Sequence, residues 1–455
     1  MSMPSRSLLP ANLDGATASD VLELAEAHQV RFLCLQFTDI LGSIKTVEVP
    51  AAQFRKALKG DIVFDGSSVA GTERVEESDM LLVPDPATFQ IFPWGDPASR
   101  VGRVICDVMT PDGVSYAGDP RAVLKRQLAI AAAQGFTMLA GMEAEFFLFA
   151  STQDGRPTAE TNDVGGYFDQ VSSARAEEAR RAIMDALEQM GFDVEAAHHE
   201  VANGQHEIDF RHAESLRTAD NVATFRFVVK QVARSFGLVA SFMPKPVLGQ
   251  NGSGMHTHQS LMQNGQNAFW DPSREWELSL VALRYIGGLL KHARAMCAVT
   301  NPLVNSYKRL VPGFEAPVNV AWSMRNRSPM IRVPDRRGDG TRLELRTPDP
   351  SANPYLALTV MLAAGLDGIR SEADWREPVN QNIGEMSYRE RRRLRVDDLP
   401  DTLHEACDEL ARDEVLREAL GEEVFQQYLA AKRSEWSEYN QQVTAWERSR
   451  YLSKY

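Results

Sequence analysis

The sequence predicts a two-domain protein of the α+β class. With 455 residues, the chain exceeds the roughly 250–300 residues at which single hydrophobic cores stop growing. Its first part contains short strand-like segments with helices between them, and a linker at residues 112–118 follows. Beyond the linker, predicted helices alternate with strands that carry polar residues in pairs. We therefore expect a small N-terminal α+β domain and a larger C-terminal domain.

Helix caps, glycines and apolar runs predict the elements of the first domain. Thr17 opens a helix, because Thr17 and Asp20 form a capping-box-like pattern. A turn that contains Gly42 joins two strands, and a helix then stops at Gly60. The predicted strands are 32–37, 44–49, a segment that begins at residue 63, and 104–108, and the second helix is 51–59.

The second domain is expected to begin and end with helices. Asp119 caps the first helix, Pro120 occupies its first turn, and Gly135 ends it. From Asp397 onward the chain is rich in charged helix formers with periodic apolar positions, which is typical of terminal helices.

The composition argues against several classes of protein. A net charge of −13 argues against a nucleic-acid partner that is held by bulk electrostatics. The four cysteines lack any CxxC spacing, which excludes a thiolate zinc site and suits a reducing cytoplasm. The N-terminus has no apolar signal core, and no run reaches about 18 apolar residues. We expect a soluble, cytoplasmic protein without a membrane span.

The segment 141–149 is apolar and rich in aromatic residues, which predicts a buried strand. In a strand, Glu143 and Glu145 would point to the same side. Two buried carboxylates side by side repel each other and lose hydration, and a hard divalent cation removes both penalties. The alternative is a pair of ordinary glutamates on the solvated face of an edge strand.

A second pair of glutamates flanks Asn203-Gly204, a dipeptide that strongly favours a two-residue type I′ hairpin turn. Such a turn would place Glu200 directly opposite Glu207, which is destabilising without a cation between them. A solvent-facing pair that water relieves is the alternative for this pair alone. Two like-charged pairs in one chain favour a metal site.

A glycine-rich loop at residues 249–254 precedes a strand with alternating polar residues. Glycines let the backbone approach a ligand, and the alternation places His256, His258 and Ser260 on one face. Neither of the usual glycine-rich phosphate loops is present. Three polar groups in register beside the loop favour a binding site over a lone structural histidine.

Arginines are frequent between residues 309 and 346. In the predicted strand 342–346, Arg342, Glu344 and Arg346 share a face. Arginine forks match the oxygens of carboxylates and phosphates, so several together suit a polyanion such as a nucleotide. A solvated basic face is the alternative, but it explains the interleaved Glu344 less well. Acidic pairs and arginines without a nucleophile motif indicate phosphoryl transfer. The other arginines are Arg309, Arg325, Arg327 and Arg332.

Taken together, these motifs closely resemble those of the bacterial type I glutamine synthetase family. The resemblance runs from about residue 19 to residue 455, and its most specific parts are residues 64–68, 143–145, 251–256, 305–317 and 342–355. The family makes glutamine from glutamate, ammonia and ATP through a γ-glutamyl phosphate. Its dodecamer consists of two stacked hexameric rings with active sites between subunits. The resemblance implies a β-grasp-like N-terminal domain at 15–112 and a catalytic domain at 118–455, with a curved antiparallel sheet flanked by helices.

The resemblance also implies ligands for two or more divalent cations, Mg²⁺ or Mn²⁺, and for the substrates. The first cation would be held by Glu145, Glu200 and Glu207, and the second by Glu143, His256 and Glu344. The residues expected to bind glutamate are Asn251, Gly252, Arg309 and Arg346. Those expected to bind ATP or the transferred phosphoryl group are Glu195, His212, His258, Ser260, Arg327, Arg332 and Arg342.

Four residues match catalytic positions of the family. Asp65, donated by the adjacent subunit, would bind ammonium and help to deprotonate it, since ammonia is the nucleophile. Tyr167 matches a residue near the ammonium site, and Arg327 matches one that stabilises the phosphoryl group. Glu315 matches the flap that closes over glutamate and excludes water.

The regulatory positions resemble the shorter subtype of the family. Gly384 stands where the longer subtype carries an adenylylated tyrosine, so we expect no adenylylation there. Arg74 matches an arginine implicated in feedback inhibition by glutamine. Thr72 replaces a tryptophan of the longer subtype, which leaves nucleotide contacts at that edge open.

Two other functions are weighed against glutamine synthesis. A relative that joins glutamate to a polyamine or to ethanolamine would use the same metal and arginine positions. The presence of Asp65, Tyr167 and Glu315 favours ammonia. A catalytically dead scaffold, structural or regulator-binding, should lack a metal ligand, and none is missing. Binding of a regulatory protein in addition to catalysis stays open.

Overall fold

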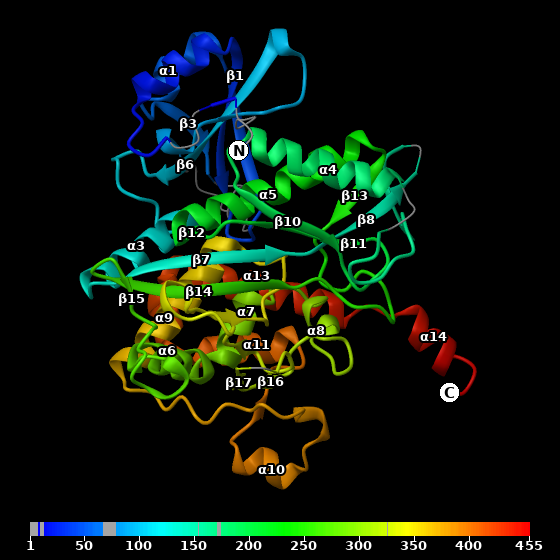
Figure 1. Cartoon of the computed structure of the whole chain (residues 1–455). Coiled ribbons are helices and arrows are strands. Elements are labelled where there is room, and N and C mark those ends of the chain that lie inside the picture. Colours follow the sequence, from blue (N-terminus) through cyan, green and yellow to red (C-terminus); the bar gives the residue numbers. More distant parts are fainter. Residues whose placement is uncertain (1–7, 10–12, 67–78, 153, 171–173, 325) are drawn as a thin grey trace.

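The computed structural model describes residues 8–9, 13–66, 79–152, 154–170, 174–324 and 326–455. Within them, a small N-terminal sheet with its helices lies against a larger body that is built around two further main sheets (Figure 1). This arrangement confirms the predicted α+β class. Among the described residues, no helix is both long and apolar enough to cross a membrane.

The N-terminal sheet has the strand order β2-β1-β6-β4-β3, with β5 beside β6. Its strands are β1 (Val30–Thr38), β2 (Ile44–Pro50), β3 (Ile62–Asp65), β4 (Asp79–Pro84), β5 (Gln90–Ile91) and β6 (Arg100–Met109). Helix α1 (Ala18–Ala27) begins with the predicted capping box between Thr17 and Asp20. The predicted helix 51–59 is shorter, because a 3₁₀ turn at Ala51–Gln53 precedes α2 (Phe54–Ala57).

Two sheets, antiparallel except for the β17–β18 pair, form the centre of the C-terminal part. One sheet has the order β12-β7-β14-β19-β18-β17, with β15 beside β14, and the other has the order β10-β11-β8-β13, with β9 beside β8. The strands of the first are β7 (Thr137–Ala144), β12 (Ala213–Glu214), β14 (Met255–Gln263), β15 (Gln266–Asn267), β17 (Trp322–Ser323), β18 (Ile331–Arg332) and β19 (Leu343–Leu345). Those of the second are β8 (Phe146–Ser151), β9 (Pro157–Thr161), β10 (Val194–His199), β11 (Gln205–Phe210) and β13 (Leu238–Ser241). A small ladder pairs β16 (Asn319–Val320) with β20 (Asp397–Asp398).

The predicted single strand 141–149 is divided at Glu145. Residues up to Ala144 belong to β7 and pair with β14, whereas residues from Phe146 belong to β8 and pair with β11 and β13. The backbone N–H of Glu145 donates to the Gly254 carbonyl at 3.1 Å. Glu143 and Glu145 therefore lie at the point where one extended chain passes from one sheet to the next.

Helices cover both sides of the β7–β14 pair (Figure 1). The helices of the C-terminal part as a whole are α3 (Pro120–Ala133), α4 (Ala174–Gln189), α5 (Ser215–Ser235), α6 (Leu280–Lys291), α7 (Ala293–Thr300), α8 (Ser306–Arg309), α9 (Pro354–Arg370), α10 (Tyr388–Arg393), α11 (Leu403–Arg412), α12 (Glu414–Leu420), α13 (Glu422–Asn440) and α14 (Ala445–Tyr451). As predicted, Asp119 caps α3 with Pro120 in its first turn, and helices end the chain.

Helix α9 is the central helix of the large core. It is buried on all sides along most of its length, as expected for a helix that is apolar all round. It crosses α6 closely, because a Cβ added at Gly288 would lie 2.0 Å from the Ala364 carbonyl oxygen. Glycine is therefore required at this crossing.

A buried ion cluster joins the two parts of the molecule. The guanidinium of Arg121 on α3 contacts Asp85 at 2.6 Å, Asp107 at 2.8 Å and Asp220 of α5 at 3.0 Å. Tyr355 of α9 donates to the same Asp220 carboxylate at 2.8 Å. Because removal of one partner would leave buried charges unpaired, this cluster fixes the N-terminal sheet against the larger body.

Candidate active site

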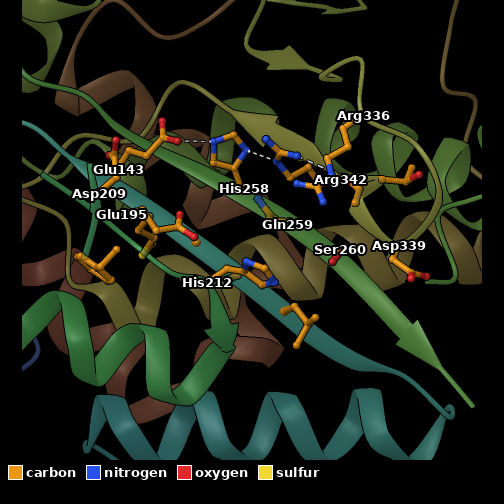
Figure 2. A pocket seen from close by; sticks show the side chains of 17 residues that line it. Glu143, Glu195, Asp209, His212, His258, Gln259, Ser260, Arg336, Asp339 and Arg342 are labelled. Carbon is orange, nitrogen blue, oxygen red and sulfur yellow. Dashed lines mark hydrogen bonds and ion pairs between the residues drawn. The ribbon is translucent and has the colours of Figure 1, made fainter. Parts of the chain in front are cut away.

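Two cavities meet at Glu143, the last outward-facing residue of β7. The larger, of about 380 Å³, is lined by residues of β7, β10, β11, β14 and the segment 336–342 (Figure 2). The smaller, of about 140 Å³, is lined by carboxylates, arginines and the segment 314–316. Glu143 lines both cavities, so a ligand that spans them would pass this carboxylate.

The pairing of β7 with β14 places the predicted polar residues on one face. His256 lies opposite Glu143, His258 opposite Gly141, and Ser260 opposite Leu139. Along β14, buried residues alternate with half-buried ones, and the three predicted residues are among the half-buried ones. Because side chains in a strand alternate between faces, this pattern turns His256, His258 and Ser260 toward the cavities.

The three predicted ligands of the second cation come together. One ligand atom each from Glu143, His256 and Glu344 lies within 4.8 Å of the others. The Nδ1 atom of His256 is 3.7 Å from Glu143 and 3.8 Å from Glu344. Glu344 is also bonded by Arg332, at 2.7 Å, and by Arg346. Burial opposes ionisation of Glu344, but His256 and Arg346 prevail and lower its pKa to about 2.

The other predicted ligand set lies at the end of the smaller cavity. Glu200 and Glu207 are buried, and each contacts His198, at 3.5 Å and 3.3 Å. Burial and the charge of nearby Glu145 raise the pKa of Glu200 to about 8 and that of Glu207 to about 10. Buried carboxylates that repel one another in this way fit a site for a divalent cation.

Glu145 joins this set but is held mainly by neutral donors. Its Oε2 atom accepts a hydrogen bond from Gln205 Nε2 at 2.8 Å and another from the Gly254 backbone N–H at 2.9 Å. It lines the smaller cavity together with Glu200 and Glu207. The structure thus brings all three predicted ligands of the first cation to one cavity.

The predicted hairpin register was wrong, although the glutamates still meet. His198, not Glu200, lies opposite Glu207, and Glu200 belongs to the connection between β10 and β11. A type I′ turn requires positive φ at both central residues, and only Gly204, at +68°, has it. Gln205 N–H does donate to the Ala202 carbonyl, as a turn centred on Asn203-Gly204 requires, but the Gln205 carbonyl accepts from Glu200 N–H and not from Ala202 N–H, which shifts the pairing of the strands.

The predicted glutamate ligands also line the smaller cavity. Arg309 on α8 is buried, and its guanidinium donates to the carbonyls of Arg346 and Thr347 at 3.1 and 2.7 Å. Arg309 therefore also fixes the chain after β19. The exposed Glu315 has a positive φ of +56° and accepts from Asn251 Nδ2 at 3.4 Å. The lining further includes Gly252, Tyr167, Arg327 and Arg332.

Most predicted nucleotide ligands line the larger cavity. Glu195 of β10 and His212 are exposed on one wall, opposite Ser260 and Arg342 (Figure 2). His258 lies between Arg342 and Glu143 (Figure 2). Arg342 Nε donates to His258 Nδ1 at 3.1 Å, so the other ring nitrogen carries the proton and donates to Glu143 at 2.7 Å. Arginine and histidine thus link the larger cavity to the carboxylate that both cavities share.

Two family descriptions match almost the whole chain. They are Glutamine synthetase, beta-Grasp domain, over residues 29–111, and Glutamine synthetase, catalytic domain, over residues 117–451. The chain belongs to the glutamine synthetase family. The predicted β-grasp and catalytic domains and the predicted family are thereby confirmed.

Individual glutamine synthetases and related structures agree with this assignment. The glutamine synthetase of Thermus thermophilus is 57% identical over 445 residues, which cover 97% of this chain and 100% of the relative. A solved structure of a GmaS/ADP complex is 36% identical with a TM-score of 0.87, over 95% of this chain and 99% of that chain. The Plasmodium falciparum glutamine synthetase is 25% identical with a TM-score of 0.84, over 96% and 99%.

Glutamine synthetases are ATP-dependent glutamate–ammonia ligases, and the predicted activity of this chain is confirmed at that level. The family uses ATP and divalent metal ions, and the described residues include ligand groups suited to such ions. Membership therefore explains why an acidic cluster, an arginine-rich wall and a nucleotide-sized cavity lie side by side.

The described residues leave the predicted roles of two further positions, Asp65 and Arg74, untested. Asp65 ends β3 and is exposed, and it lines neither of the two cavities described above. Its predicted role, exerted in the site of a neighbouring subunit, stays a prediction. Arg74, predicted to act in feedback inhibition, lies outside the described residues.

Sequence reasoning missed several residues of this glutamine synthetase site. The missed residues are Asp163, His198, Gln205, Asp209, Arg336 and Asp339. The alternation along β11 was a usable signal for Asp209, because Glu207 and Asp209 share a face. No local signal distinguishes Asp163, which reaches the site from a loop after β9.

Proposed function

We propose that this chain makes glutamine through a γ-glutamyl phosphate, with two Mg²⁺ or Mn²⁺ ions in each active site. The observation that carries the proposal is the shared Glu143, which borders both a cavity suited to a nucleotide and a cavity lined by arginines and carboxylates. A γ-phosphoryl group at that border would lie between its donor and a glutamate side chain.

The cations would be held by the two carboxylate sets. The donor chemistry fits Mg²⁺ or Mn²⁺, because five of the six predicted ligands are carboxylates and the sixth is His256. The raised pKa values of Glu200 and Glu207 indicate that the metal-free protein does not compensate a negative charge on the first set, so a cation would take the place of their protons. When bound, the cations would neutralise phosphate charge and orient the reacting oxygens.

The arginines would bind the anionic groups at both ends of the reaction. Arg309 and Arg346 lie in the smaller cavity, where a glutamate carboxylate would match their forked donors. Arg327 and Arg332 line the same cavity and Arg342 lines the larger one, in positions suited to the transferred phosphoryl group. Preorganised donors of this kind stabilise charge as it develops in the transition state.

Ammonia would be generated beside the γ-glutamyl phosphate. Asp65 of the neighbouring subunit would trap ammonium and accept a proton from it, and Tyr167 would border that site. Glu315, at the rim of the smaller cavity, would close over the substrate and exclude water. An exposed Asp65 is available to a neighbouring subunit, which is compatible with the homo-dodecamer of two hexameric rings that we propose.

We further propose a cytoplasmic enzyme that glutamine inhibits through Arg74, with domains at 15–112 and 118–455. Gly384 lies in an exposed turn at Ile383–Glu385 and offers no hydroxyl for adenylylation. The similarity to a structure of GmaS in complex with ADP supports the nucleotide assignment of the larger cavity. Ligation of an amine in place of ammonia is the second candidate, because Tyr167 and Glu315 are exposed at the cavity that would receive it.

Phosphate release from ATP tests the proposal. The assembled protein is supplied with glutamate and Mg²⁺, and ammonium is compared with a panel of amines that includes a polyamine and ethanolamine. We expect strong stimulation by ammonium alone and the formation of glutamine. Stimulation by an amine with little by ammonium would keep the metal and nucleotide sites but replace the substrate. No turnover with any of them would favour a non-enzymatic, regulator-binding role.

A further inference from the structure

A buried polar cluster lies directly behind the predicted ligands Glu200 and Glu207. The side chain of Asp163 is fully buried and accepts from His199 Nε2 at 3.0 Å and from the Gly204 backbone N–H at 2.6 Å. Its second oxygen lies 3.6 Å from His206 Nε2. Neither this oxygen nor His206 Nε2 has a hydrogen-bond partner among the described residues. Such a group is either a metal site or a hydrogen-bonded hub.

Arg180 decides between these two interpretations. Its NH1 atom lies 3.2 Å from His206 Nδ1, and a guanidinium can only donate. The Nδ1 atom must therefore accept, and the proton of the neutral ring sits on Nε2, facing Asp163. A metal ion at Nε2 would displace that proton and require Nδ1–H to face the guanidinium, which is repulsive. The cluster is therefore a hub in which Asp163 accepts from His199 and from the Gly204 backbone and faces the Nε2–H of His206 at 3.6 Å.

This hub is connected to three parts of the active site. His199 immediately precedes Glu200, and His206 immediately precedes Glu207. The Asp163 segment continues to Tyr167, and the next residue, Phe168, donates its N–H to the His199 carbonyl at 3.0 Å. The other nitrogen of His199 lies 2.6 Å from the Glu200 carbonyl and 3.1 Å from the Gly166 carbonyl.

We propose that Asp163 is a positioning residue that sets the orientation of Glu200 and Glu207 and the place of the Tyr167 loop in the active site. It acts through His199, His206 and the Gly204 backbone, and it touches no substrate. Partners of this kind behind a ligand set the geometry of the ligand itself. The assignment of Glu200 and Glu207 as cation ligands, and of Tyr167 to the ammonium site, rests on the proposed function.

The test compares Asp163→Asn with Asp154→Asn in the full-length assembled protein. In Asp163→Asn, the asparagine keeps one acceptor oxygen, but its amide group replaces the other. In either orientation this amide donor would face a second donor, the Nε2–H of His206 or that of His199. Asp154 is the matched control, because it is an exposed aspartate just before β9, whereas Asp163 follows β9, and it forms its ion pair with the exposed Arg156, at 2.9 Å. Mn²⁺ binding is measured by electron paramagnetic resonance without substrates, and KM values are measured for ammonium and ATP.

In Asp163→Asn, we expect Mn²⁺ affinity to fall by about 10- to 100-fold at one of two classes of site. The KM for ammonium should rise, while the KM for ATP and the second Mn²⁺ class stay as in the wild type. A merely structural role would instead lower both classes together with the melting temperature, which would overturn the proposal. If Asp163→Asn binds Mn²⁺ and has a KM for ammonium as in the wild type, the proposal is overturned as well.

A second variant covers the case in which Asp163→Asn does not assemble. His206→Leu removes one donor of the hub and leaves the Asp163 bonds to His199 and Gly204 in place. It should weaken the same Mn²⁺ class by a smaller factor, and unchanged binding would refute the hub. Because Mn²⁺ binding is measured without substrates, this result is independent of whether the protein makes glutamine.

Discussion

The two carboxylate sets of the active site differ in how their negative charge is balanced. Around Glu344, Arg332 and Arg346 bond the carboxylate directly, and its pKa is lowered. Around Glu207, the nearby charges are mainly other carboxylates, and His198 at 3.3 Å is its one ion-pair partner among the described residues. The protein itself compensates the charge of the first set, whereas it leaves the charge of the second set for the proposed cation to balance.

This difference indicates an order of events. An uncompensated set attracts a cation on its own, because like-charged buried groups are relieved by it. The Glu344 set lies beside Arg332, Arg342 and Arg346, which lowers its attraction for a free cation and raises its attraction for an anion. We therefore expect the set with Glu207 to load its cation first and the set with Glu344 to load its cation together with the nucleotide phosphates.

Replacement of a ligand in either set should have the largest effect. Glu207→Gln and Glu344→Gln each keep shape but remove a charge that faces the proposed cation, and we expect turnover to fall by about 10²–10³-fold or more. Steady-state glutamine formation with saturating Mg²⁺ measures this loss. Asp154→Asn is the control. Near-normal turnover in either variant would remove that carboxylate from the cation site.

The same two variants should separate when unfolding is measured in the presence of a chelator. Glu344→Gln leaves the buried Arg346 without its carboxylate, so we expect destabilisation of about 3 kcal/mol. Glu207→Gln removes a carboxyl group whose ionisation is opposed by burial and by Glu145, so the metal-free protein should be as stable as the wild type or more stable. Thermal melting of the assembled protein gives the sign of each change. If both variants melt below the wild type, the two sets do not differ in charge balance.

The sequence predicted the members of both sets better than their geometry. Alternation along β14 was enough to place His256, His258 and Ser260 on one face, because a single strand obeys a period of two residues. The predicted pairing of β10 with β11 was wrong, because Glu200 N–H takes the Gln205 carbonyl while Ala202 N–H donates to the Gln205 side chain, and no dipeptide signal encodes that difference. The charge balance was also beyond the sequence, because Arg332 reaches Glu344 from another strand.

In the fold, too, local features were predicted and features that depend on distant contacts were not. Caps at Thr17 and Asp119 are local and were predicted correctly. The break of the strand at Glu145 was not predicted, because it arises where the chain changes partners from β14 to β11 and β13. The hub at Asp163 likewise depends on contacts between residues about 40 positions apart, as its bond to Gly204 illustrates.

A smaller difference between the two carboxylate sets should appear in how the folding stability of the metal-free protein depends on pH. The folded pKa values of Glu200 and Glu207, about 8 and about 10, lie above the ordinary value of 4.5. Between these limits the folded state binds more protons than the unfolded state, so stability falls as pH rises from about 5 to 8. Glu344 has the opposite shift, and its contribution is lost only as pH falls toward about 2.

Melting temperatures measured from pH 5 to 8 with a chelator, and again with saturating Mn²⁺, check this prediction. The melting temperature should change less with pH in Glu207→Gln, because the titrating carboxyl group is gone. It should also change less in the Mn²⁺-bound protein, because the cation keeps that group ionised. An equal slope in all three samples would assign the pH dependence to other groups, such as the buried Asp119, whose pKa burial raises to about 7.

The smallest expected effect is at Asp209, which belongs to the uncompensated set without being a predicted ligand. Asp209 lines the larger cavity, and its charge helps to raise the pKa of Glu207, after burial and Glu145. Asp209→Asn keeps the shape and removes only long-range attraction for the cation, so Mn²⁺ affinity should fall by about two- to fivefold at high effective dielectric. Turnover at saturating Mn²⁺ should stay close to that of the wild type. A loss as large as that in Glu207→Gln would make Asp209 a ligand in its own right, and the set would then contain four carboxylates in place of three.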